Sequence, residues 1–295
     1  MKLAKHLITA TVLSVAAAQS ASAGESPFGW IYPADVQPAG TKQFQQWVDV
    51  QRTQTQGQYT NTLLRSELEL GITPKYQTSI YLNSRVISAN KNGMSGTSGG
   101  PNTDIPDSFD TTTRYKMSRI ESLSWENLYQ VYNPLIDPIG LALYLEPQWG
   151  PRNKNVEFKL ILQKNFLDDR LIWATNFVTE LEKNNRGSKI ERATEVDVLT
   201  GASYRFANNW SAGAELRNHR EFTGYGYGVA NHSAWFLGPN VHYATNTWWI
   251  TAAWRHQLKH AVGFQDDQKE VISNGRIYGD EHTLNQFTAK LGVPF

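Results

Sequence analysis

The sequence lacks cysteine, lacks a strong excess of either charge and, after its first residues, lacks any long apolar run. Without cysteine there is no disulfide and no lipid-modified N-terminal cysteine. The 28 basic and 27 acidic residues give a formal net charge of +1, which offers no electrostatic case for binding nucleic acid or an anionic membrane surface. A mean hydropathy of −0.48, with no apolar run of bilayer length, argues against helical membrane spans.

The N-terminus is predicted to be a cleaved secretory signal peptide, residues 1–23. Lys2 and Lys5 form a basic start, and residues 7–18 form an apolar run too short to cross a bilayer. Ala21-Ser22-Ala23 offers the small residues of a cleavage site. Cleavage there removes two of the 28 basic residues and none of the 27 acidic ones, so the mature net charge is −1.

The C-terminal segment alternates between apolar and polar residues and ends in an aromatic residue. One face carries Phe287, Ala289, Leu291, Val293 and Phe295, and the residues between them are polar or small. A strand has a period of two, so this segment predicts a strand with one apolar face. Terminal strands of bacterial outer-membrane barrels have this form, and we expect the barrel-assembly machinery to bind the strand that ends in Phe295.

The same alternation recurs along the chain and predicts about twelve strands, separated by Gly, Pro and Asn turns. Between Arg114 and Tyr132 the parity breaks, because Arg119 and Glu121 share the parity of Leu123. We expect either a bulge there or a part of the strand that rises above the lipid. The predicted strands are 43–51, 62–72, 76–83, 114–132, 139–149, 156–163, 171–179, 195–206, 210–217, 235–243, 248–257 and 286–295.

Two regularities favour a membrane barrel over a secreted sandwich, which is the soluble alternative. Short turns alternate with longer connections at about 89–113, 182–190, 223–233 and 260–281, as in outer-membrane barrels. The chain also has ten Trp, 13 Tyr and 12 Phe, many of them at the predicted strand ends. Such aromatic belts form at the two membrane interfaces. The predicted interface aromatics are Trp149, Trp173, Tyr204, Trp210, Trp235, Tyr243, Trp248 and Phe295.

The predicted fold is therefore all-β: a closed, antiparallel, up-and-down transmembrane β-barrel of about twelve strands, spanning residues 43–295. Closure follows because a sheet at bilayer depth cannot keep unpaired edges. Residues 24–42 are predicted to be a short leader that lies at the periplasmic mouth or inside the barrel as a plug. At this strand number the bore is expected to be narrow or plugged.

The polar face of the predicted strands is rich in charges of both signs, and these are the candidate lumen residues. They indicate either a wet channel with a transverse field, which selects polar solutes, or a wall stiffened by ion pairs. Their near-balance argues against strong ion selectivity. The acidic candidates are Glu67, Glu69, Glu146, Glu157, Glu180, Glu195, Asp197 and Glu215, and the basic ones are Arg65, Arg85, Lys159, Arg205, Arg217, Arg255 and Lys290.

No catalytic residue, metal site or cofactor is predicted. Asn231-His232-Ser233 superficially resembles the His and Ser of the outer-membrane phospholipase, but its surroundings differ, and adjacent strand residues face opposite sides. His219, His242 and His256 lie on three strands without metal-ligand spacing. Asp104, Asp107 and Asp110 lack the order of a calcium-binding EF-hand.

Three segments resemble an uncharacterised family of proteobacterial outer-membrane barrels, similar to those named for phenol-degradation pathways (MetA-like proteins). They are Asp137-Pro138-Ile139-Gly140-Leu141-Ala142-Leu143-Tyr144-Leu145-Glu146-Pro147, Phe28-Gly29-Trp30-Ile31-Tyr32 and Gly238-Pro239-Asn240. The resemblance covers most of the mature chain and implies an outer-membrane barrel. It transfers no catalytic or binding residue.

We therefore expect a protein of the outer membrane of a Gram-negative bacterium, in contact with lipid, that passes small polar solutes through a narrow channel. The alternative from another class is a non-conducting barrel with a structural or surface-binding role carried by its loops. A lipid-modifying enzyme is the third reading. Nucleic acid is not an expected partner.

Overall fold

The computed structural model describes residues 25–91, 113–186, 189–279 and 282–295. The predicted signal peptide and the aspartates at 104, 107 and 110 lie outside these ranges, so the predictions made for them remain predictions.

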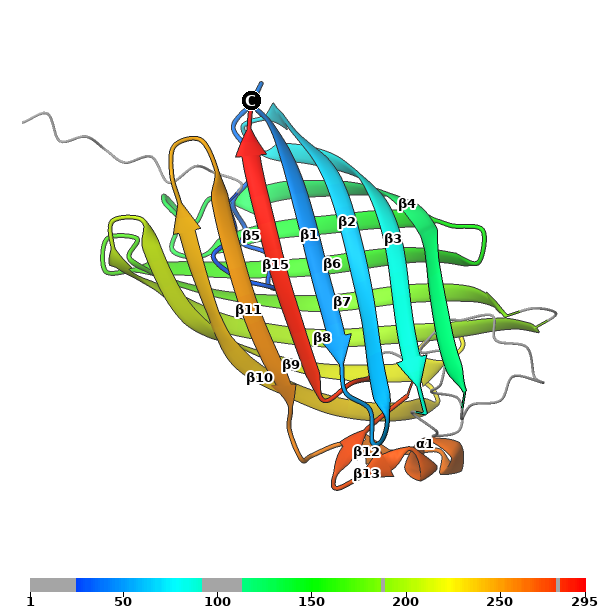
Figure 1. Cartoon of the computed structure of the whole chain (residues 1–295). Coiled ribbons are helices and arrows are strands. Elements are labelled where there is room, and N and C mark those ends of the chain that lie inside the picture. Colours follow the sequence, from blue (N-terminus) through cyan, green and yellow to red (C-terminus); the bar gives the residue numbers. More distant parts are fainter. Residues whose placement is uncertain (1–24, 92–112, 187–188, 280–281) are drawn as a thin grey trace, which may run out of the picture.

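Twelve long antiparallel strands of the described chain close into a ring (Figure 1). Each strand pairs with its neighbours in sequence, β15 pairs with both β1 and β11, and β10 pairs with β11, so the ring has no open edge. The predicted closed barrel is confirmed. The ring consists of β1 (Lys42–Arg52), β2 (Gln58–Thr73), β3 (Tyr76–Asn90), β4 (Arg114–Tyr132), β5 (Gly140–Trp149), β6 (Asn153–Phe166), β7 (Leu171–Arg186), β8 (Lys189–Ala207), β9 (Trp210–Thr223), β10 (Ala230–Ala244), β11 (Trp249–Gln257) and β15 (Asn285–Pro294).

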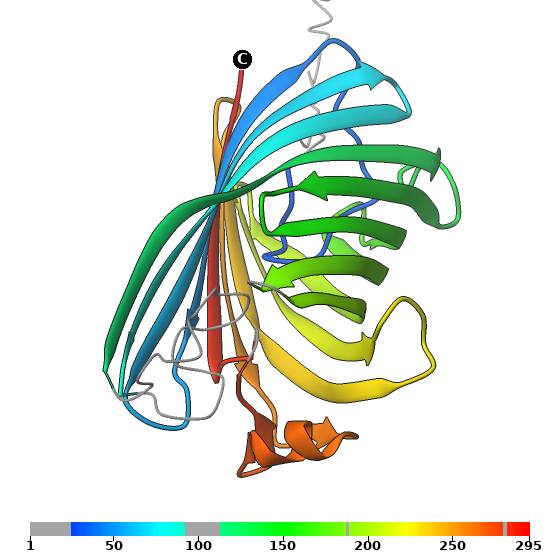
Figure 2. The same ribbon diagram turned by 90° about the vertical axis from the view of Figure 1, so that its right-hand side faces the viewer.

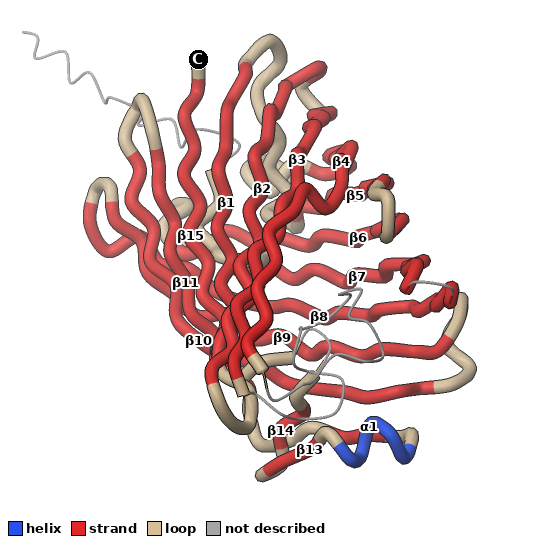
Figure 3. Tube along the Cα trace, turned by 45° about the vertical axis from the view of Figure 1, so that its right-hand side comes forward, coloured by secondary structure: helices blue, strands red, loops and turns tan. Residues whose placement is uncertain are grey.

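The ring has two unlike ends. Short connections and the C-terminus lie at one end, which we call the turn end. The longest connections lie at the other end, the loop end, together with the short connections between β5 and β6 and between β7 and β8. The connection from β11 to β15 is structured there: it contains β12 (Val262–Gly263), α1 (Asp266–Glu270), β13 (Ile272–Ser273) and β14 (Arg276–Ile277), packed beside the ring (Figure 3).

The expected bulge in β4 is present. Asn83 pairs with Ser122 and Ser84 pairs with Ile120, so Glu121 is the extra residue. Because of this shift, Tyr115 and Met117 pack against Tyr59 inside the barrel, whereas their parity with Leu123 had placed them outside. One added residue exchanges the inward-facing and outward-facing side chains in the part of β4 that precedes it. This exchange explains why the alternation in the sequence appeared broken.

Several strands are longer than predicted, and the extra residues lie mostly at the loop end. β7 continues to Arg186 and β8 begins at Lys189, so most of the predicted loop 182–190 is strand. The predicted loop 223–233 shortens to the residues between Thr223 and Ala230. Both faces of these extensions are polar, because they rise beyond the apolar band, and the alternation that marks a half-buried strand disappears there.

Large apolar side chains cover the outer surface of the ring. Leu143, Leu160 and Phe177 lie side by side on β5, β6 and β7 and are 40–49% exposed. In water such a patch would be unusual, whereas lipid accepts it. No helix in the described ranges is long and apolar enough to cross a bilayer.

The predicted interface aromatics point outward. Trp149, Tyr204, Trp210, Trp248 and Phe295 are exposed, and Trp173, Trp235 and Tyr243 are partly exposed. At the turn end, the ring centroids of Trp210 and Tyr243 are 4.7 Å apart, and those of Tyr243 and Trp248 are 5.4 Å apart. Rings with one apolar body and one polar edge suit the boundary between lipid and water.

A charge in this apolar band should destabilise the barrel. We expect Leu160→Arg to lower the free energy of unfolding by about 2–4 kcal/mol, the usual cost of a basic residue near the bilayer midplane. The measurement is denaturant unfolding of the protein reconstituted in lipid. The matched control, Ile190→Arg, alters an exposed side chain on the polar extension of β8 and should change stability little. Equal effects of the two substitutions would contradict a lipid-facing band at Leu160.

Candidate functional site: the lumen and its leader

The segment that precedes β1 in the sequence contains no helix or strand and runs through the interior of the ring. We call its described part, residues 25–41, the leader. Figure 2 shows it in dark blue inside the strands, and Figure 1 shows the same placement. Phe28, Ile31 and Ala34 are completely buried. Because the leader makes no ladder of its own, its backbone groups need partners from the wall.

Glu215 on β9 provides the first of these partners. Its two carboxylate oxygens accept hydrogen bonds from the backbone N–H groups of Gly29, at 2.5 Å, and Trp30, at 2.9 Å. Asn240 on β10 also donates its side-chain amide to Glu215, at 2.9 Å. A carboxylate that accepts from two successive amides fixes both the path and the direction of the chain.

Side-chain amides of the wall hold the next part of the leader. Asn176 on β7 accepts from the N–H of Tyr32 at 2.7 Å and donates to the carbonyl of Tyr32 at 2.8 Å, as a neighbouring strand would. Ala34 is held in the same way by two residues: its N–H donates to Gln163 at 2.7 Å, and its carbonyl accepts from Gln130 at 2.9 Å.

The leader ends over a set of glutamines gathered around Glu69 on β2. The N–H of Gln37 donates to Gln77 at 2.7 Å. Glu69 in turn accepts from the side chains of Gln37, Gln43, Gln45 and Gln77. Such charge-assisted hydrogen bonds from four amides compensate for the burial of the carboxylate.

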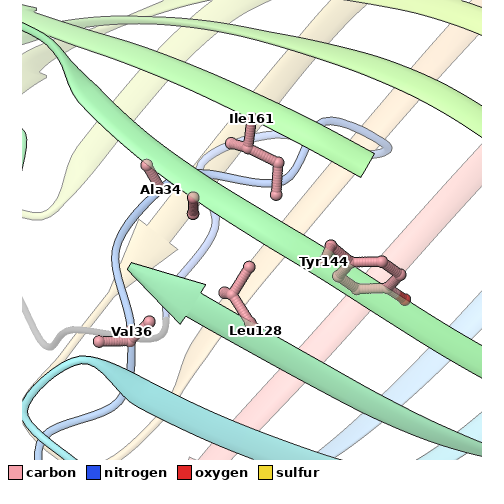
Figure 4. Close-up of a cluster of buried hydrophobic side chains, with 6 residues drawn as sticks. Ala34, Val36, Leu128, Tyr144 and Ile161 are labelled. Carbon is pink, nitrogen blue, oxygen red and sulfur yellow. The ribbon is translucent and has the colours of Figure 1, made fainter. Parts of the chain in front are cut away.

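Apolar contacts also hold the leader against the wall. We call the wall residues that contact the leader, polar and apolar together, its seat. Ala34 and Val36 pack against Leu128, Tyr144 and Ile161 of the wall (Figure 4). A second cluster joins Phe28 and Ile31 to Ala174, Val178 and Leu199. These wall residues occupy inward positions that are polar elsewhere in the ring, and they mark where the leader lies.

Gly29 lies close against the wall. A Cβ atom at this position would lie 2.5 Å from the Cβ of Ala253 and 2.7 Å from Cγ2 of Thr288. No side chain fits there without displacing the leader, so glycine is required for the close approach.

Aromatic rings of the leader and wall stack with buried cations. Arg255 lies 4.0 Å from the ring centroid of Trp30, and Lys159 lies 3.9 Å from that of Tyr32. Lys290 lies 3.6 Å from the ring centroid of Trp47. The negative face of each ring partly compensates the cation for lost water.

The leader separates two cavities. The loop-end cavity, about 220 Å³, is bounded by Trp30 and Tyr32 of the leader and by charged residues of the wall. The turn-end cavity, about 600 Å³, is bounded by Pro27, Pro33 and Asp35 of the leader and by the turns. Both cavities hold water-sized space lined with polar groups.

All of the charged candidates in the described side chains point inward, but they fall into groups with different surroundings. Arg65, Glu157, Lys159, Asp197, Arg217 and Arg255 line the loop-end cavity, and Arg205 lines the turn-end cavity. Glu67, Glu69, Arg85, Glu146, Glu195, Glu215 and Lys290 are buried at the wall or beneath the leader. Glu180 is half-buried and lies beside Glu182 and Glu195. Glu69 and Glu215 hold the leader and border neither cavity, whereas Lys159 and Arg255 both stack on leader rings and line the loop-end cavity.

Ion pairs join many of these groups. Arg217 binds Asp197 through two hydrogen bonds of 2.6 Å, and Lys159 lies 2.6 Å from Glu157. Pairing within the lumen reduces the field that any one charge presents to a solute. The two interpretations of the lumen charges, a wall stiffened by ion pairs and a wet channel, thus apply to the same residues. These ion pairs stiffen the wall, and their side chains also line the loop-end cavity.

Sequence reasoning missed several residues of this interior. Glu126 is buried in the lumen, on the segment of β4 that follows the bulge. Asp49 and the aromatic residues Trp30, Tyr32 and Trp47 line the loop-end cavity. Asp49 lies between two outward-facing apolar residues of the first strand, so the alternation of the strand could have predicted that its side chain points inward. The leader aromatics carried no periodic signal.

Three histidines meet at the loop end, two of which had been considered in other roles. His219 on β9 meets His232 on β10 and His282 of the final connection; His242 and His256 lie elsewhere. His232 points to this cluster, whereas Ser233 accepts a hydrogen bond from Asn218 at 3.1 Å. Burial, followed by the neighbouring rings of His232 and His219, holds the pKa of His282 well below its usual value.

Comparisons with known proteins give one family model and several similar solved structures. Residues 20–295 match a family model described as a family of unknown function (DUF6662). The COG4313 outer membrane channel from Pseudomonas putida F1 superposes with a TM-score of 0.54 at 12% identity, over 88% of this chain and 96% of that one. The NanC porin gives a TM-score of 0.49 at 10% identity, over 85% and 98%. No curated protein matches the sequence.

Removing the carboxylate of Glu215 should loosen the leader. Glu215→Ala leaves two buried backbone N–H groups without an acceptor, at a cost of about 1–3 kcal/mol each. Because the chain has no cysteine, Ile31→Cys introduces a single thiol, and its reaction rate with a soluble maleimide measures exposure of the leader. We expect faster labelling when Glu215→Ala is added. Glu270→Ala, on the exposed helix α1, is the control; an unchanged rate with Glu215→Ala would show that this carboxylate does not hold the leader.

Proposed function

Because the chain belongs to this family of unknown function, we propose a role from the geometry of its lumen: a narrow outer-membrane channel for small polar solutes, with the leader as its constriction. The observation that carries this proposal is the pair of polar cavities on either side of the leader. A barrel that served only as a wall would not need water-sized space lined by charges of both signs.

The charges of the loop-end cavity indicate the class of solute. Arg65, Lys159, Arg217 and Arg255 line it together with Glu157 and Asp197. Facing groups of opposite sign create a field across the bore, which favours small dipolar or zwitterionic solutes over simple ions. Aromatic faces of Trp30, Tyr32 and Trp47 limit the size of what passes.

The location of the protein is part of the proposal. Export through a signal peptide cleaved after residue 23 would deliver the chain to the periplasm, and the strand ending in Phe295 would direct it to the assembly machinery. The exposed apolar band and its aromatic borders then contact outer-membrane lipid. In this orientation the turn end faces the periplasm.

A second candidate is a non-conducting barrel with a structural or surface-binding role. The extensive seat of the leader favours it, because side chains of the wall bind the leader backbone at intervals from Gly29 to Gln37. They are Glu215, Asn176, Gln163, Gln130 and Gln77. A plug held this firmly would close the lumen. The loops at the loop end would then carry the function.

The other readings have less support. Ser233 and His232 face different surroundings, so they do not form a nucleophile–base pair for lipid hydrolysis. The resemblance to barrels named for phenol-degradation pathways remains a hypothesis about relationship. The loop-end cavity is lined by paired charges as well as aromatic residues, which suits a polar solute better than an apolar ring.

Conductance separates the channel from the non-conducting barrel. In planar bilayers we expect small single-channel currents from the full chain. Deletion of residues 28–37 should raise them several-fold, because the two cavities would join. A milder variant, Glu215→Ala with Asn176→Ala, weakens the seat without removing residues and should raise the open probability. Absence of current from every variant that remains folded would favour the non-conducting barrel.

Ion selectivity tests the role of the cavity charges. Arg217 lines the loop-end cavity, so Arg217→Gln should leave Asp197 without its main partner and shift the reversal potential in a salt gradient toward cation preference. Glu69 borders neither cavity and is covered by four glutamines, so Glu69→Gln should not shift the reversal potential. Lys269→Gln, on α1, serves as the surface control. Identical reversal potentials for Arg217→Gln and the parent would contradict a conducting path past Arg217.

A further inference from the structure

The three histidines at the loop end form a cluster that the channel does not require. His219 and His232 project from adjacent strands, and His282 comes from the connection between β11 and β15. Their ring centroids are 4.4–5.6 Å apart, and one nitrogen from each ring lies within 4.8 Å of the others. All three side chains are buried, at 0–3% exposure.

Hydrogen bonds to the outer nitrogens orient two of the rings. The Nδ1 atom of His232 lies 2.9 Å from Oε1 of Gln268, and that of His219 lies 3.0 Å from Oδ1 of Asp197. If Gln268 accepts from Nδ1–H, the lone pair of His232 is on Nε2. This is the arrangement in which carboxylate or carbonyl groups support metal-binding imidazoles. Nδ1 of His219 also lies 2.9 Å from the guanidinium of Arg217, which can only donate, so Asp197 alone does not set the tautomer of His219.

Two nitrogens of the cluster lack partners. Nε2 of His232 and Nδ1 of His282 are buried and have no hydrogen-bond partner among the described residues. A buried polar atom left in this state costs about 1–3 kcal/mol. Two such atoms, on rings that meet each other, indicate a missing ligand rather than a packing arrangement.

The chemistry of the donors defines the ligand. Three neutral imidazoles suit a divalent transition-metal ion such as Zn²⁺, and do not suit Ca²⁺ or Mg²⁺, which prefer oxygen. Zinc–nitrogen bonds of about 2.0–2.1 Å place tetrahedral ligands roughly 3.3 Å apart, so the rings would need to close by about 1.5 Å. His282 lies outside the ring of strands and can make this movement without disturbing the wall.

We propose that His219, His232 and His282 bind a divalent transition-metal ion of the Zn²⁺ class. The three histidines supply three ligands and leave the fourth position to water or another small ligand. The nearby charge of Arg217 is already paired with Asp197 by two hydrogen bonds, which reduces its repulsion of the ion. The ion would join β9 and β10 to the final connection, of which Gln268 and His282 are both part.

The site lies beside the loop-end cavity. His219 contacts both Asp197 and Arg217, which line that cavity, and His282 stacks on Phe236, whose ring lies 5.9 Å from the guanidinium of Arg217. Binding of an ion would therefore fix the connection against the mouth of the lumen. This proposal stands on the histidine geometry and does not depend on whether the lumen conducts.

Metal titration of the detergent-purified full chain tests the site, provided that no polyhistidine tag is present. We expect one equivalent of Co²⁺ to produce the visible absorption bands of a four- or five-coordinate site, and Zn²⁺ to displace it. His282→Ala and His232→Gln should each weaken Zn²⁺ binding at least tenfold in competition with a chelator. His260→Ala, an exposed histidine of the same connection, should bind as the parent does.

A second readout separates loss of the site from loss of the fold. Zn²⁺ should protect residues 258–284 of the parent and of His260→Ala from protease, but not those of His282→Ala. Heat-modifiable migration on gels should show all of these variants as folded barrels, since His282 is outside the strands. Absence of stoichiometric Co²⁺ or Zn²⁺ binding by the folded parent, or equal binding by His282→Ala, would overturn the proposal.

Discussion

Satisfaction of backbone hydrogen bonds at bilayer depth is the constraint on which this structure depends. The ring meets it by pairing every strand on both sides, from β1 round to β15 and β11. The leader also passes through this depth but forms no strand, so it meets the same requirement through side chains of the wall. Glu215, Asn176, Gln163 and Gln130 replace the missing ladder. Because the buried surroundings of these bonds have a low dielectric constant, each hydrogen bond contributes more to stability than it would in water.

That requirement explains how polar residues are distributed inside the barrel. Amides and the carboxylates of Glu215 and Glu69 lie where the leader runs, whereas paired charges lie where water-sized space remains. Glu69 and Arg217 illustrate the difference. Glu69 is enclosed by glutamines, and Arg217 faces the loop-end cavity with Asp197 as its partner. An inward charge in a barrel is thus not by itself evidence of a path for solute.

The ring was predictable from the sequence because lipid imposes one simple pattern on every strand. Leu143, Leu160 and Phe177 alternate with polar residues for the same physical reason, and even the irregularity at Glu121 was visible as a change of parity. Where the alternation of apolar and polar residues ends, the sequence no longer predicted the strands. The loop-end extensions of β7 and β8 are polar on both faces and looked like loop.

The interior was less predictable, because its contacts join residues far apart in sequence. The inward direction of Glu215 was readable from parity, but its bond to Gly29, 186 residues away, was not. Leu199 and Val178 stood at inward positions as apolar exceptions, which was a signal of a covering segment that sequence reasoning did not use. The meeting of His219, His232 and His282 likewise needed the register of β9 and β10 and the return of the final connection.

The seat of the leader has a consequence for the order of assembly. Its hydrogen-bond partners come from β2, β3, β4, β6, β7, β9 and β11, so the seat does not exist until most of the sheet has formed. Contacts of such long sequence separation form late, because the intervening chain must first be ordered. The leader precedes every strand in synthesis, yet it can reach its final position only after nearly all of them are in place.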